Sequence, residues 1–91
     1  MATSPTIEPV WQRIEKNAGK IFRQIKGGEF TYEVVHGHLI PDRTSRQIPL
    51  SNFEKALALV PLSTTKEIQH LQGPSYIFAV LMDPRIRKDE W

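Results

Sequence analysis

A chain of 91 residues with 40% hydrophobic and 24% charged side chains is long enough to build one hydrophobic core, and this composition excludes the intrinsically disordered class. The absence of cysteine excludes disulfides and thiolate metal sites, and no apolar run approaches the ~20 residues of a membrane-spanning helix. The net charge is only +2, but five cations and one acid lie between residues 10 and 26, so the basic charge is local. The first residues lack the features of a signal peptide, so we expect a cytoplasmic single domain, with loose termini at 1–6 and 86–91.

Residues 10 to 25 have the apolar period of a helix with one buried face. The predicted inward residues are Val10, Trp11, Ile14, Ala18, Ile21, Phe22 and Ile25. Gly27 or Gly28 is expected to end this helix in the left-handed conformation of a C-cap. Gly19 lies on the polar side at a cost of ~1 kcal/mol, either as a tolerated defect or because another group approaches closely there.

The period then changes from that of a helix to that of a strand. Residues 29–35 alternate in polarity, which predicts a strand with one buried face. His36-Gly37 predicts a tight turn into a second strand over 38–41. A polar loop follows over 42–47, and a short third strand can run through Ile48.

Two capping boxes predict helix starts in the second half of the chain. Ser51 to Glu54 predicts a helix to about Val60, and 64–67 predicts a short helix with Ile68 and Leu71 inward. The apolar run 74–83 suits a buried helix or a buried strand, and its flanking prolines favour a helix. The predicted class is α+β: an N-terminal amphipathic helix, a small antiparallel hairpin or three-stranded sheet, then two or three short helices.

The polar side of the first helix suggests a function. It carries a stripe of cations with few acids to neutralise them: Arg13, Lys16, Lys20, Arg23 and Lys26. Such a stripe could contact successive phosphates of a nucleic acid, although any amphipathic helix also needs a solvated face. The loop residues Arg43, Thr44, Ser45 and Arg46 offer guanidinium and hydroxyl groups that commonly bind phosphate oxygens. We therefore expect a small nucleic-acid-binding module, in which stripe and loop form one surface.

Other chemistries have weaker support. Residues 17–20 lack the upstream glycine and the hydroxyl residue of a phosphate-binding loop, and His36 and His38 lack obvious further zinc ligands. A helix-turn-helix over 65–81 would expose hydrocarbon instead of base-reading side chains. We therefore expect no metal, no cofactor and no catalysis. The competing hypothesis is a protein-interaction or inhibitory module that binds an acidic surface or adds a strand to another sheet, with a homodimer through Trp11 or Tyr76 as a variant.

Overall fold

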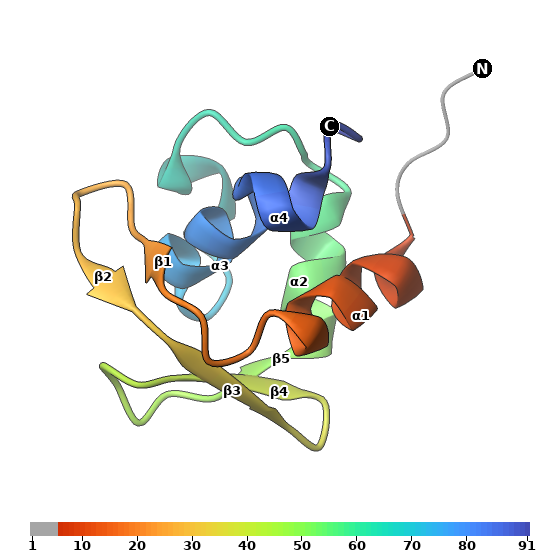
Figure 1. Cartoon of the computed structure of the whole chain (residues 1–91). Helices are drawn as coiled ribbons and strands as arrows, with labels where there is room; N and C mark the ends of the chain where they lie inside the picture. The colour runs from red at the N-terminus through yellow and green to blue at the C-terminus, as the bar shows by residue number, and fades with distance from the viewer. Residues whose placement is uncertain (1–5) are drawn as a thin grey trace.

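The computed structural model describes residues 6–91, and Figure 1 shows the course of the chain. The elements are α1 (Ile7–Lys16), β1 (Phe22–Arg23), β2 (Glu29–Phe30), β3 (Tyr32–Val35), β4 (His38–Pro41), β5 (Ile48–Pro49), α2 (Leu50–Leu57), the 3₁₀-helix η1 (Thr65–Ile68), α3 (Pro74–Leu81) and α4 (Pro84–Arg87). β1 and β2 form an antiparallel hairpin, and β3, β4 and β5 form a separate antiparallel sheet in that order. The predicted α+β class is confirmed. Of the termini expected to be loose, residues 1–5 lie outside the described part of the chain.

The helices gather on one side of the three-stranded sheet (Figure 1). α1 contacts β3, and α2 contacts β5. The β1–β2 hairpin lies at the opposite end of the molecule from α1 and α2, beside α3. The hairpin therefore presents a surface of its own.

The first helix is shorter than its apolar pattern predicts. α1 buries the expected residues as far as Ile14, but it ends at Lys16 instead of reaching Ile25. Gly19 adopts a left-handed φ of +88°, which no right-handed helix can continue through. Its N–H donates to the Tyr32 carbonyl at 2.9 Å. Gly19 thus turns the chain from α1 toward the sheet, and it is not a defect tolerated inside a helix.

An aromatic cluster takes the place of the second half of the predicted helix. Phe22 is buried as expected, but in β1, with its ring centroid 6.0 Å from that of Phe30 and 5.2 Å from that of Tyr32. Complete burial of such a ring contributes roughly 1.5–3 kcal/mol, more than a few further helical residues would. Extended chain turns successive side chains to opposite sides, so the neighbours of Phe22 face solvent. The prediction of burial is wrong for Ala18, Ile21 and Ile25.

The β1–β2 turn spans residues 24–28. The Gln24 N–H donates to the Gly28 carbonyl at 2.7 Å, and the Gly27 N–H donates to the Gln24 carbonyl at 2.8 Å. Gly27 has a φ of +93°. One of the two glycines is therefore left-handed, as expected, but it closes a hairpin and does not cap a helix.

The β3–β4 hairpin agrees with its sequence pattern. His36 and Gly37 have φ values of 49° and 75°, the positive pair that a two-residue turn matched to strand twist requires. The register pairs Val35 with His38 directly beside the turn. The predicted third strand is also present, because β5 pairs with β4 through Ile48.

The second helix starts earlier than expected. α2 begins at Leu50, directly after the extended residue Pro49, and no side chain caps it. Ser51 lies inside the first turn, so its predicted role as a cap is wrong. The helix ends at Leu57, and the predicted burial of Val60 is only partial.

The second capping box is confirmed, although it opens a 3₁₀-helix. The Thr64 hydroxyl oxygen accepts from the Lys66 N–H at 3.2 Å, and the Glu67 carboxylate accepts from the Thr64 N–H at 3.1 Å. Ile68 and Leu71 are buried, as predicted. These contacts fix the chain that leads into α3.

The run 74–83 forms α3, the favoured alternative for this segment. Gly73 precedes it in the left-handed region with φ +61°, and Ile77, Val80 and Leu81 are fully buried. Within residues 6–91, no helix combines the length and the apolar character needed to cross a bilayer.

The chain after α3 packs against the fold. Ile86 of α4 is fully buried, and the Trp91 indole N–H donates to the Leu81 carbonyl at 2.8 Å. Glu90 binds Arg13 of α1. Residues 86–91 therefore do not form the loose terminus that their charge suggested.

Candidate interaction surface

The five cations of the predicted stripe are divided between two parts of the fold. Arg13 and Lys16 lie on α1, whereas Lys20, Arg23 and Lys26 lie on the chain that enters and forms the β1–β2 hairpin. Because α1 ends at Lys16, the prediction of one helical stripe is wrong. All of them except Arg13 are exposed.

Arg13 is engaged within the molecule. Its guanidinium forms an ion pair with Glu90 at 2.6 Å and donates to the Ile86 carbonyl at 2.9 Å, and its side chain is only 18% exposed. The hydrogen bonds from Arg13 lower the pKa of Glu90. Arg13 therefore fastens the end of the chain to α1.

The hairpin and the basic loop meet at Glu29. Its carboxylate pairs with Arg23 at 2.9 Å, and its backbone carbonyl accepts from the Arg43 guanidinium at 3.2 Å. Lys20 and Lys26 form no ion pair with any residue of the described chain. The structure thus brings the loop to the hairpin, away from α1.

The rest of that loop is polar and exposed. The Arg46 N–H donates to the Thr44 hydroxyl oxygen at 3.2 Å, which closes a local turn around Ser45. Ser45 and Arg46 are exposed, and Thr44 is half-buried. The hydroxyl of Thr44 is therefore partly occupied by the loop itself.

Two isoleucines on the hairpin are the surface residues that the sequence interpretation missed. Ile21 is 59% exposed and Ile25 is 55% exposed. A two-residue period was available as a signal, because Ile21, Arg23 and Ile25 alternate with the buried Phe22. The helical pattern over the same residues concealed it.

Ile25 stands between two surface hollows. The first measures about 280 Å³ and is lined among others by Gln24, Lys26 and Ser75, and we call it the Lys26 hollow. The second measures about 240 Å³ and is lined in part by Phe78 and Met82 of the α3 region. We call Ile21, Ile25 and these two hollows the hairpin face.

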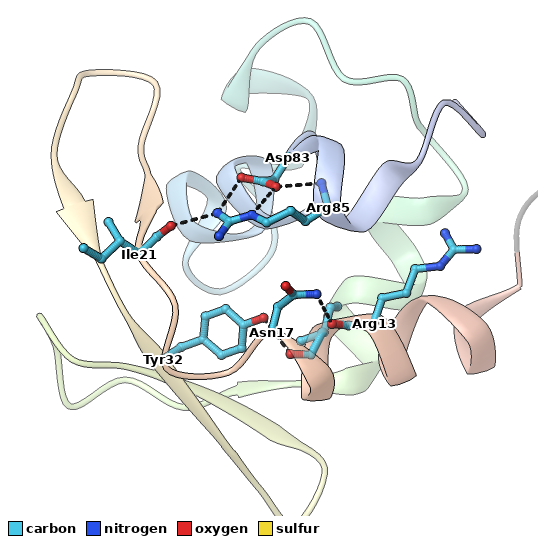
Figure 2. Close-up of polar contacts among 7 residues, drawn as sticks. Arg13, Asn17, Ile21, Tyr32, Asp83 and Arg85 are labelled. Atoms are coloured by element: carbon cyan, nitrogen blue, oxygen red, sulfur yellow. Dashed lines mark hydrogen bonds and ion pairs between the residues drawn. The ribbon is translucent and has the colours of Figure 1, made fainter.

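The hairpin is held in place by Arg85 (Figure 2). Its guanidinium donates to the Ile21 carbonyl at 2.7 Å and lies 4.1 Å from the centre of the Phe22 ring. Asp83 accepts two further hydrogen bonds from the same guanidinium, both of 2.9 Å. Partial burial raises the pKa of Asp83, but the hydrogen bonds and charge of Arg85 outweigh burial and hold that pKa below its ordinary value. Asp83 therefore stays charged and orients Arg85.

A second polar contact joins the sheet to the end of α1. Figure 2 shows the Tyr32 ring directed at the last turn of that helix, where its hydroxyl donates to the Ile14 carbonyl at 2.6 Å. Burial raises the pKa of Tyr32, which keeps the hydroxyl protonated as a donor. Beside it, the Asn17 amide donates to the Arg13 carbonyl at 2.8 Å. These bonds satisfy helix-end carbonyls and fix the start of the chain that leads to the hairpin.

The serine of the hairpin face is not activated as a nucleophile. Ser75 accepts a hydrogen bond of 3.0 Å from the Gln24 amide, which is not a base, so the serine hydroxyl is not activated. Within residues 6–91, the only side-chain hydrogen bond of His38 is with the His36 carbonyl, at 3.0 Å. Within residues 6–91, no three His, Asp or Glu side chains gather as a metal ion requires.

The aromatic residues proposed for a homodimer contact lie largely inside the protein. Trp11 is only 7% exposed and packs edge-on against Phe53 at 5.5 Å. Tyr76 is half-buried against Phe30, with ring centroids 4.9 Å apart. Trp11 is therefore buried, whereas Tyr76 stays partly exposed.

Comparisons with protein-family models, with curated proteins and with solved structures give no match. Function must therefore be inferred from the surface itself.

Proposed function

We propose that this chain is a non-enzymatic protein-interaction module that binds its partner through the hairpin face. The observation that carries this proposal is the exposure of Ile21 and Ile25, at 59% and 55%, on a hairpin that Arg85 and Ser75 anchor to the body. Burying the exposed half of each isoleucine would contribute on the order of 1 kcal/mol per residue. Apolar residues on an anchored hairpin bind with a smaller ordering cost than residues on a free loop.

The cations around Ile25 favour an acidic partner, whereas Ile21 borders a hollow lined in part by Glu29 and Asp42. Lys20 and Lys26 are exposed, and Arg23 is exposed despite its pairing with Glu29. Exposed cations at the rim of a contact accelerate association with an acidic surface and discriminate against a basic one. The hairpin face thus combines apolar contact with positive charge.

Addition of a strand to β3 is less favoured. Its outer edge spans only four residues, and the Tyr32 carbonyl already accepts from Gly19. A short edge that is partly occupied offers few backbone bonds to an added strand. Side-chain contact with the hairpin face is the better-supported mode.

Nucleic-acid binding is the second candidate, and one observation favours it. Arg23 and Arg43 lie together at Glu29, with Lys20 and Lys26 on the same hairpin. Two features weigh against it. Glu29 offsets part of this charge, and Arg13 is engaged with Glu90.

Selection of random displayed peptides of about 12 residues on the full chain tests the first candidate. We expect peptides that bind the wild type and fail to bind an Ile21→Ser/Ile25→Ser variant. The matched control is a Val35→Ser/Leu59→Ser variant, which alters two exposed apolar residues elsewhere, 42% and 43% exposed. The proposal would be refuted if the enriched peptides also bind the Ile21→Ser/Ile25→Ser variant, or if no peptide is enriched.

Duplex DNA binding, measured at about 50 mM and about 200 mM salt, tests the second candidate in parallel. DNA binding that weakens steeply with salt and is lost in a Lys20→Glu/Lys26→Glu variant would support the nucleic-acid function. Binding of peptides without binding of DNA would support the protein-interaction function.

A further inference from the structure

The Lys26 hollow of the hairpin face is lined mainly by residues whose side chains carry hydrogen-bonding or cationic groups. Besides Ile25 and Pro74, it is lined only by hydrogen-bonding or cationic side chains: Gln24, Lys26, Thr65, Gln69 and Ser75. None of the residues lining it is acidic. Its volume of about 280 Å³ admits a side chain, since a single water takes about 30 Å³ of liquid.

The hydrogen bond inside this hollow leaves a donor available to a ligand. The Gln24 amide donates to the Ser75 oxygen at 3.0 Å, so the serine hydroxyl serves as the acceptor of that bond. A hydroxyl carries one proton besides its acceptor sites, and the Ser75 proton is therefore not used in this contact. Together with the Lys26 ammonium, it offers two donors to an anionic group. A carboxylate, which only accepts hydrogen bonds, matches them.

The second hollow adds apolar side chains beside that carboxylate. Both hollows share Ile25, and the second is lined by Phe78, Ala79 and Met82 together with Arg23, Asp83 and Pro84. Its carboxylate, Asp83, is already bound by Arg85. A single segment laid across Ile25 would place an acidic side chain on one side and an apolar side chain on the other.

We propose that the partner of the hairpin face is an acidic-apolar peptide segment, whose aspartate or glutamate enters the Lys26 hollow while a nearby apolar side chain packs on Ile25 and Met82. This proposal rests on the proposed function and specifies its partner. Charge complementarity with Lys20 and Lys26 selects this occupant over a neutral or basic segment.

The test repeats the peptide selection on the wild type and on Lys26→Ala, with Lys55→Ala as the matched control. Lys55 is an exposed lysine on α2, at the other end of the molecule. We expect aspartate and glutamate to be enriched at least about twofold in peptides selected by the wild type and by Lys55→Ala. The Lys26→Ala selection should lose this acidic preference and keep the apolar one.

A double-mutant cycle then measures the contact. The strongest acidic peptide is compared with its version in which glutamine replaces glutamate. We expect this replacement to weaken binding about tenfold for the wild type and less than about twofold for Lys26→Ala. Only the wild type has the Lys26 ammonium that the peptide glutamate would contact. A Ser75→Ala variant should lie between these two.

The outcomes separate this inference from the proposed function. Peptides that need Ile21 and Ile25 but show no acidic preference, or keep it in Lys26→Ala, overturn the inference and leave the proposed function standing. A selection with no peptide dependent on the two isoleucines overturns both.

Discussion

Replacement of Arg85 by methionine should release the hairpin from the body of the protein. Methionine keeps much of the side-chain length but removes every polar contact of the guanidinium. Three contacts are lost: the bond to the Ile21 carbonyl at 2.7 Å, the pair with Asp83 at 2.9 Å and the stacking on Phe22 at 4.1 Å.

The expected loss in the free energy of unfolding is about 2–3 kcal/mol. A hydrogen bond from a charged group contributes roughly 1.5–3 kcal/mol. The Arg85 side chain is 38% exposed, so solvent screening limits the pair with Asp83 to at most about 1 kcal/mol. Stacking on Phe22 adds about 0.5–1 kcal/mol. One group makes all three contacts, so these values are not fully additive.

Urea unfolding measures this loss, and amide hydrogen exchange locates it. We expect a midpoint lower by about 1–2 M urea. Exchange should accelerate more at the Gln24 amide, which bonds within the hairpin turn, than at the Met82 amide at the end of α3. Arg46→Met, in the exposed loop, is the control and should change stability by less than about 0.5 kcal/mol. The role given to Arg85 is wrong if its variant is as stable as this control, or if both amides lose protection equally.

Four further substitutions test other contacts of the fold. Gly73→Ala should cost about 2–4 kcal/mol in urea unfolding, because its Cβ would lie 2.6 Å from Ile48 Cδ1 at a φ of +61°. Gly37→Ala, at a φ of +75° with open space around it, should cost only about 1–2 kcal/mol, and equal costs would contradict the crowding. Tyr32→Phe should lower the free energy of unfolding by about 1–3 kcal/mol by leaving the Ile14 carbonyl without its donor, and an unchanged value would show that water replaces it. The pKa of Asp83 lies below its ordinary value of 3.8, so its charge stabilises the fold above that pH and this contribution disappears as the pH falls through the lowered value. Thermal unfolding should therefore show Asp83→Asn less stable than the wild type near neutral pH, with the gap closing below about pH 4, and a gap independent of pH would exclude this origin.

The parts of the fold that the sequence predicts correctly depend on neighbours in the chain. His36-Gly37 supplies both positive φ values of its turn, and the Thr64 box is complete within four residues. The prolines flanking α3 favoured a helix for an ambiguous apolar run. In each case the signal and the structure lie within the same few residues.

The end of α1 depends on contacts from elsewhere. The helical period continues past Lys16, but the chain becomes extended where Phe22 packs against Phe30 and Tyr32. Gly19 was noticed, but its left-handed φ follows from its bond to Tyr32 in the sheet. A one-dimensional pattern therefore placed Ile21 and Ile25 in the core, although they are the exposed residues of the hairpin face.

The charges of the candidate site show the same limit. Arg13 looked free of acidic partners because Glu90 lies 77 residues further along the chain. The meeting of Arg43 with Glu29 likewise depends on the fold. The sequence identified which residues are basic but could not show which of them remain available.

The contact between Arg13 and Glu90 also bears on the order of folding. It joins residues 77 positions apart, so it closes a long loop. Such contacts form late, after local turns and helices have paired. The contact should therefore have little effect on the folding rate and should mainly slow unfolding.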